Sequence, residues 1–194
     1  MFRQFDVQMW EIFAGNGLLL VCSLFYLLWW TLVFKPGASG SAAGTASITL
    51  AVLTGIVGLG LMLAGLNAHV KDFRSFSNWY VILAGIILYA VLLLITRFAF
   101  DRQVTSELLI FTGWTVLEIS VVNEMYGIGR FGTGLSIFLA AVIVLILIIS
   151  LICYVLYYRL DAYKGWIDGM IPLISVAAGM VVILISLALG NLKQ

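Results

Sequence analysis

The chain has 194 residues, of which 63% are hydrophobic and 10% are charged, and its mean hydropathy is +1.16. Soluble domains are about half apolar and about a quarter charged, so this composition excludes a soluble globular domain. Ten Lys and Arg nearly balance nine Asp and Glu, which excludes a nucleic-acid binder and a disordered chain. Two cysteines are too few for a disulfide scaffold. A multi-span membrane protein remains.

Six stretches of the chain are long and apolar enough to cross a bilayer. A hydrocarbon core about 30 Å thick needs about 20 apolar residues of helix. Nearly uncharged stretches of that length lie at about 10–34, 46–66, 79–98, 108–126, 134–158 and 169–190. We therefore expect an all-α integral membrane protein in which residues 1–194 form a single polytopic domain with six transmembrane helices. The connections are short, so function must lie within the helices or at their ends.

Charge does not decide the orientation of these spans. An even number of spans places both termini on one side of the membrane, and the positive-inside rule then compares the Lys and Arg of the two sides. Five lie on the terminal side (Arg3, Lys71, Arg74, Arg130 and Lys193) and five on the other (Lys35, Arg97, Arg102, Arg159 and Lys164). The expectation of cytoplasmic termini in the inner cell membrane therefore rests only on how common that arrangement is.

The ends of the odd-numbered spans resemble one another, which favours three consecutive helical hairpins. Spans three and five end in a basic residue, a second basic residue five positions later, and a polar residue that could cap the next helix. These residues are Arg97, Arg102 and Ser106 in one case and Arg159, Lys164 and Asp168 in the other, with Ser47 as a looser match after span one. The alternative is that no hairpin repeat exists, because aromatic and basic residues gather at any membrane–water interface and would produce the same pattern.

The even-numbered spans are rich in small residues, which allow helix backbones to approach closely in lipid. The second span contains Ala51, Gly55, Gly58, Gly60 and Gly65. We expect spans two, four and six to line the interior of the bundle. The same small residues would also suit a homo-oligomer or a membrane partner protein.

One carboxylate, Glu118, lies near the middle of a span. An ionisable group at that depth costs several kcal/mol unless it is neutralised, paired or hydrated, so it predicts a functional site. Helical spacing places Trp114 on the same face and Thr115 beside it, and Asn123 continues the polarity toward the end of the span. The alternative is a neutral glutamic acid that helps helices to pack. Glu124 is expected at the hydrated end of the span.

The remaining polar residues offer little chemistry. Asn16, in the first span, suits either a solute pathway or an interhelical hydrogen bond. His69 is the only histidine, and Cys22 and Cys153 lie in different spans. We therefore expect no metal site, no cofactor and no nucleophilic catalysis.

These residues predict a small-solute membrane transporter or channel, linked to proton movement through the near-midplane glutamate. The expected solute or proton pathway contains Glu118, Trp114, Thr115, Asn16 and Asn123. The alternative is a non-catalytic membrane subunit that scaffolds or regulates a partner protein, in which the same groups are structural. No catalytic residue is expected, and the expected partners are the lipid bilayer, a small solute or a proton, and a second copy or a membrane partner protein, not nucleic acid.

Overall fold

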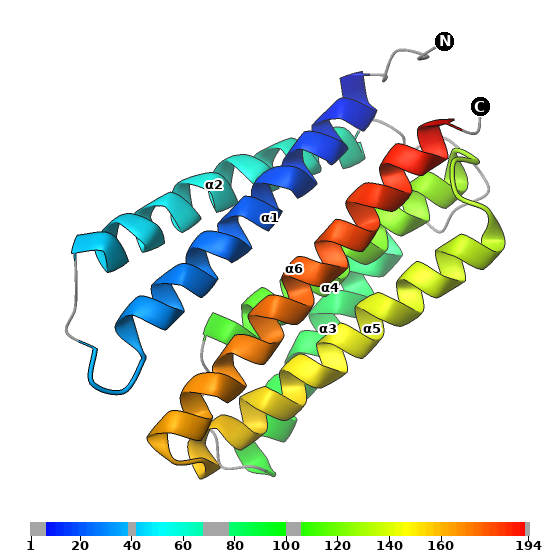
Figure 1. The fold of residues 1–194 in the computed structure, drawn as a ribbon. Helices are drawn as coiled ribbons and strands as arrows, with labels where there is room; N and C mark the ends of the chain where they lie inside the picture. The colour runs from blue at the N-terminus through cyan, green and yellow to red at the C-terminus, as the bar shows by residue number, and fades with distance from the viewer. Residues whose placement is uncertain (1–6, 39–41, 68–77, 100–105, 193–194) are drawn as a thin grey trace. The chain divides into compact units, whose positions relative to one another are not determined.

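A computed structural model of the chain describes residues 7–38, 42–67, 78–99 and 106–192. In these ranges the protein has six α-helices, one short 3-10 helix and no strand (Figure 1). The elements are α1 (Val7–Val33), α2 (Ala42–Asn67), α3 (Asn78–Phe98), α4 (Ser106–Gly127), α5 (Thr133–Leu156), η1 (Tyr157–Arg159) and α6 (Ala162–Leu192). All six α-helices are long and apolar enough to span a membrane, which confirms the predicted all-α, six-span fold.

Several hydroxyl side chains inside the spans donate hydrogen bonds to carbonyls of their own helices. In lipid no water is present to bond an exposed polar group, so such groups must be satisfied within the protein. Ser47 Oγ donates to the carbonyl of Ala43 at 2.8 Å, and Thr54 Oγ1 donates to the carbonyl of Leu50 at 2.7 Å. Ser47 was expected to cap the second span, but α2 begins at Ala42 and Ser47 lies inside it.

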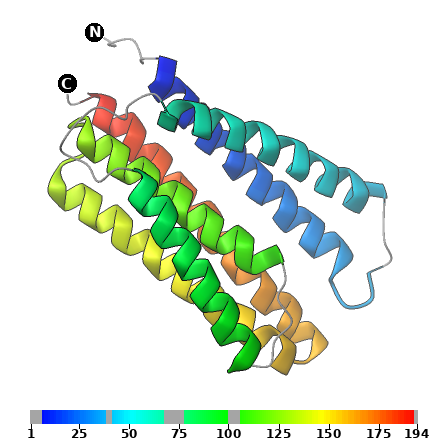
Figure 2. The same cartoon turned by 180° about the vertical axis from the view of Figure 1, so that it is seen from behind.

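Contacts between helices divide the chain into two compact units. Unit 1 contains α1, α2 and α6, and unit 2 contains α3, α4, α5 and η1. In unit 1, α1 packs against both α2 and α6; in unit 2, α4 packs against both α3 and α5 (Figure 1 and Figure 2). The first two predicted hairpins are thus packed pairs, whereas α5 and α6 belong to different units. The single polytopic domain and the hairpin repeat stay predictions.

Glycines allow α1 and α2 to pack in close contact. A Cβ added to Gly15 would lie 2.7 Å from Met62 Cγ and 2.9 Å from the carbonyl oxygen of Gly58. A Cβ added to Gly58 would lie 3.0 Å from the carbonyl oxygen of Gly15. Close packing of this kind holds helices together in lipid, where the surroundings are as apolar as the helix surface. Gly58 of α2 therefore faces α1, and the lining of the bundle interior by spans two, four and six stays a prediction.

Helix α6 begins earlier than the sequence predicted. It starts at Ala162 rather than near 169, because Asp161 caps it: the backbone N–H of Lys164 donates to Asp161 Oδ1 at 2.9 Å. The Lys164 amine lies 3.1 Å from Asp161 Oδ2. Asp168, which was expected near the start of this helix, lies at the end of its second turn and is buried.

The contact between α1 and α2 predicts a disulfide. A Cβ on Gly55 would lie 3.9 Å from Cys22 Cβ, inside the range of about 3.5–4.5 Å that disulfides need. In a Cys153→Ala chain, Gly55→Cys should therefore cross-link α1 to α2 on mild oxidation. With a protease site inserted between the two helices, the fragments should stay joined on a gel until reductant is added. Gly60→Cys is the control, since nothing lies within 4 Å of its Cβ, and equal cross-linking of both variants would contradict the packing.

The cap of α6 predicts a dependence on pH. The backbone N–H of Lys164, and then its side chain, hold the pKa of the exposed Asp161 below its ordinary value. Because the pKa of Asp161 is lower in the folded protein, its carboxylate stabilises the helix end at pH values above the unfolded-state pKa. This stabilisation is lost as the pH falls through the folded-state pKa. Amide exchange should therefore show a protection factor at Lys164 that declines below about pH 4. In Asp161→Asn this protection factor should not change with pH, and in Asp161→Ala it should be lower at every pH. A protection factor in Asp161→Ala equal to that of wild type would refute the cap.

Candidate functional site

Helix α4 is the inner helix of unit 2 and the least apolar of the six. The mean hydropathy of its most apolar window is 1.3, against 3.3 for α5, and that window is the most buried among the six spans. Its buried side chains include five polar ones: Thr112, Thr115, Glu118, Ser120 and Glu124. Polar groups thus gather on the helix that has the least surface open to lipid, which is where intramembrane polar residues are tolerated.

Packing on both sides holds α4 within unit 2. Toward α3, a Cβ on Gly85 would overlap the Val116 side chain, so the glycine makes room for it. Toward α5, two side chains from each helix form one buried apolar cluster: Leu108, Phe111, Leu147 and Tyr154. These contacts position the polar side chains of α4 on a rigid element.

Glu118 is completely buried, with 0% of its surface exposed. It lies near the middle of the span Glu107–Gly127. Along the same face of α4, Trp114 precedes it by one turn, and Val121 and Val122 follow it by about one turn; all three are buried. The carboxyl group therefore lies between apolar side chains of its own helix, so α4 alone provides no continuous polar track from its end to Glu118.

The hydroxyls near Glu118 are already bonded. Thr115 Oγ1 donates to the carbonyl of Phe111 at 2.9 Å, and Thr112 and Ser120 bond carbonyls four residues earlier in the same way. Each hydroxyl keeps its lone pairs and can still accept a hydrogen bond. Thr115 can thus accept a hydrogen bond from a solute. To donate one, it must first break its hydrogen bond to the Phe111 carbonyl.

Trp114 presents an unused hydrogen-bond donor. The side chain is 7% exposed, and among the described residues no group accepts a hydrogen bond from Nε1. A buried donor without an acceptor costs about 1–3 kcal/mol. Because Trp114 and Glu118 share a face of α4, a donor and a carboxyl lie one helical turn apart.

The other predicted residues of α4 occupy different positions. Asn123 is half-buried and lies about 140° around the helix from Glu118, so it does not share that face. Glu124 is 4% exposed, although its place near the end of the span predicted hydration. Sequence analysis missed this second buried carboxyl because distance from the end of a span does not show how far neighbouring helices cover it.

Asn16 lies in unit 1 and is completely buried on α1. It belongs to a buried row that repeats every seven residues: Met9, Asn16, Ser23 and Trp30. Trp30 at the end of this row contacts α6, whereas Gly15 and Cys22 face α2. The position of Asn16 is therefore defined within unit 1, and its sharing of a pathway with Glu118 stays a prediction.

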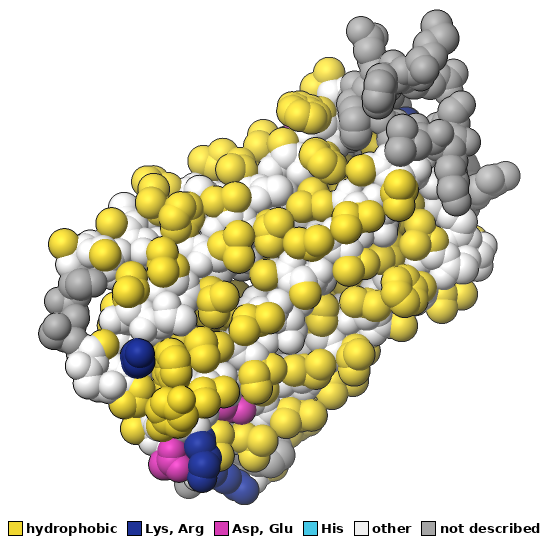
Figure 3. Space-filling model, in the orientation of Figure 1, with side chains coloured by type: hydrophobic (Ala, Val, Ile, Leu, Met, Phe, Trp, Pro, Cys, Tyr) yellow, Lys and Arg dark blue, Asp and Glu magenta, His cyan; other side chains and the backbone are white. Residues whose placement is uncertain are grey.

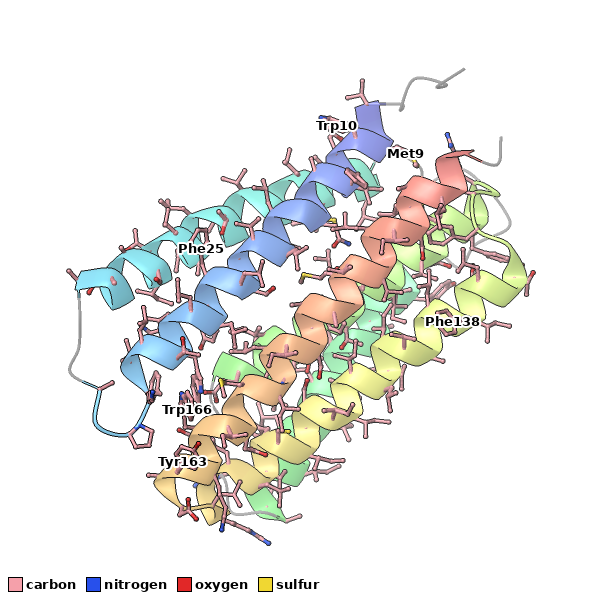
Figure 4. All side chains as sticks on the ribbon, in the orientation of Figure 1. Met9, Trp10, Phe25, Phe138, Tyr163 and Trp166 are labelled. Atoms are coloured by element: carbon pink, nitrogen blue, oxygen red, sulfur yellow. The ribbon has the colours of Figure 1, made fainter. Side chains whose placement is uncertain are left out.

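Trp30 joins α1 to α6 at one end of unit 1. Its Nε1 donates to the carbonyl of Trp166 at 3.0 Å, and its ring occupies the space that a Cβ on Gly169 would fill. Phe34 stacks on Trp30 at 4.4 Å between ring centroids, and Lys35 Nζ lies 5.9 Å from the centroid of Trp166. Figure 4 shows Tyr163 and Trp166 near the start of α6. Aromatic and basic side chains of this kind favour the boundary between membrane and water.

Figure 3 shows hydrophobic side chains along the described surface of one face, with Lys, Arg, Asp and Glu side chains gathered near one end. This distribution fits helices in contact with a lipid bilayer. In the described part of the chain no three His, Cys, Asp or Glu side chains could together hold a metal ion, and His69 lies outside that part. A comparison of the chain with protein-family profiles, curated proteins and solved structures found no significant match.

A matched pair of substitutions tests whether the Trp114 donor is unused. Trp114→Phe and Trp30→Phe both shrink a buried ring, but only Trp30 loses a hydrogen bond. Trp30→Phe should lower the free energy of unfolding in mixed micelles by about 1 kcal/mol more than Trp114→Phe does. An equal loss in both variants, or a larger one at Trp114, would show that Trp114 Nε1 is satisfied in the folded protein.

Proposed function

We propose that the chain is a small-solute transporter or channel, linked to proton movement, whose pathway includes Glu118 and Trp114. The observation that carries the proposal is the complete burial of Glu118 near the middle of the inner helix of unit 2. An amide or a hydroxyl would supply packing hydrogen bonds at that depth for a smaller desolvation cost. A carboxyl group differs from them in that it can release and recover a proton.

The groups around Glu118 suit a small polar solute. The neutral, protonated carboxyl is compatible with the buried Trp114 and Val121 on the same face, while the charged form costs more free energy to bury there. Trp114 Nε1 can donate to an acceptor atom of the solute, and Glu118 can accept from a donor atom. Arrival of a solute that carries both groups would therefore favour release of the proton.

A second candidate function, a non-catalytic membrane subunit, is favoured by a different observation. The Thr112, Thr115 and Ser120 hydroxyls all bond their own helix, and apolar side chains flank Glu118 along α4. A helix of this kind could pack tightly without any aqueous pathway. The two functions differ in whether water reaches Glu118.

Accessibility and proton flux test the proposal on one set of proteoliposomes. In a chain without Cys22 and Cys153, cysteines placed at Thr115, Glu118 and Val122 should react with a membrane-impermeant thiosulfonate from at least one side. Glu118→Gln should abolish proton influx, driven by a potassium diffusion potential and followed with a trapped pH-sensitive dye. Glu124→Gln, which removes the other buried carboxyl of α4, should leave most of the flux.

Two controls define the outcomes. A cysteine at Leu145, which is exposed on the apolar α5, should stay unlabelled, and one at the exposed Gly132, directly before α5, should react. If all three α4 positions stay unlabelled while Gly132→Cys reacts, the core is dry and the subunit function replaces transport. Equal proton influx in wild type and Glu118→Gln would reject proton linkage at this residue.

A further inference from the structure

Unit 2 carries a cleft that the proposed function does not use. It lies between α3 and α5, has a volume of about 370 Å³, and is lined by side chains from residues 92–96 and 148–156. Every lining residue except Thr96 is Leu, Ile or Val. The Thr96 hydroxyl donates to the carbonyl of Leu92 at 2.8 Å, so this side chain also leaves its hydrogen-bonding group turned to its own helix. The cleft is thus a hydrocarbon surface.

The cleft reaches one end of the unit, where two arginines lie. Helix α4 runs antiparallel to α3 and α5, so the last turns of α3 and α5 lie at the same end (Figure 2). Arg97 directly follows Thr96, and Arg159 lies three residues beyond Leu156 at the end of η1; both arginines are exposed. Arg159 thus lies one short 3-10 turn beyond Leu156 of the cleft.

Both arginines are exposed, and neither forms an ion pair with any residue in the described ranges. Lys164 differs, since its amine lies 3.1 Å from the carboxylate of Asp161. An apolar cleft with two exposed guanidinium groups at its end matches a molecule with a hydrocarbon chain and an anionic head.

We propose that the cleft binds an anionic phospholipid, with an acyl chain between α3 and α5 and the phosphate at Arg159. Arg97 adds a second positive charge at the same end. Guanidinium groups bind phosphate oxygens through paired hydrogen bonds. In a zwitterionic headgroup, the positive group partly neutralises the charge of the phosphate, so the attraction to arginine is weaker. Since α3 and α5 are long and apolar enough to span the membrane, lipid acyl chains lie against this surface. The arginines then favour anionic headgroups over zwitterionic ones. Binding of a second copy in the same cleft is the competing outcome of the experiments below.

Native mass spectrometry of the purified full chain in detergent tests the headgroup. Phosphatidylglycerol and phosphatidylcholine with identical acyl chains are titrated separately, and wild type should retain phosphatidylglycerol more tightly. Arg159→Gln should reduce this preference about fivefold, the effect of one basic residue near an anionic lipid. Arg159→Lys should keep most of it. Lys164→Gln removes a cation that is already paired and should leave the preference unchanged.

A second pair of variants tests the chain-binding part of the cleft. Ile152→Trp fills the cleft and should weaken retention of both lipids, whereas Ile137→Trp, exposed near the other end of α5, should not. Equal retention of the two lipids by wild type, or an unchanged preference in Arg159→Gln, would overturn the proposal. Inorganic phosphate that competes with phosphatidylglycerol at similar concentration would show a free-anion site instead, and a dimer lost only in Ile152→Trp would place a second copy in the cleft. None of these results depends on Glu118.

Discussion

Association of helices in a solvent that is itself apolar is the constraint on which this structure depends. Lipid does not drive apolar faces together, so backbones must approach closely or exchange polar contacts. Gly15 and Gly58 provide the first kind of contact between α1 and α2, and the Trp30 bond to the Trp166 carbonyl provides the second between α1 and α6. One helix therefore uses two faces, and unit 1 is assembled around α1.

The same constraint explains why two groups of α4 stand out. Every polar side chain that enters a span needs a partner within the protein, and the Thr112, Thr115 and Ser120 hydroxyls find theirs on their own helix. Trp114 Nε1 has no acceptor among the described residues, and Glu118 carries an ionisable group to a depth where simpler groups would serve packing. Under the proposed function, these two side chains of α4 are where a solute or a proton acts.

Charges at the ends of the helices divide into compensated and uncompensated ones. Asp161 and Lys164 pair with each other across the first turn of α6, and Lys35 lies over the Trp166 ring. Arg97 and Arg159 have no such partners among the described residues, and both lie where the apolar cleft of unit 2 ends. In the proposed lipid site an anionic headgroup pairs with these two arginines.

The sequence by itself determined the number of spans, their approximate limits and the depth of Glu118, because length and apolarity are local properties. Only the tertiary structure decided that Gly55 and Gly58 of α2 face α1, that α6 packs on α1, and that Glu124 is buried. The start of α6 likewise depended on the Asp161 cap. The physical reason is that lipid-facing and protein-facing surfaces of a membrane helix are both apolar, so hydrophobic periodicity does not distinguish them. Partners are chosen instead by shape and by hydrogen bonds between segments far apart in the chain.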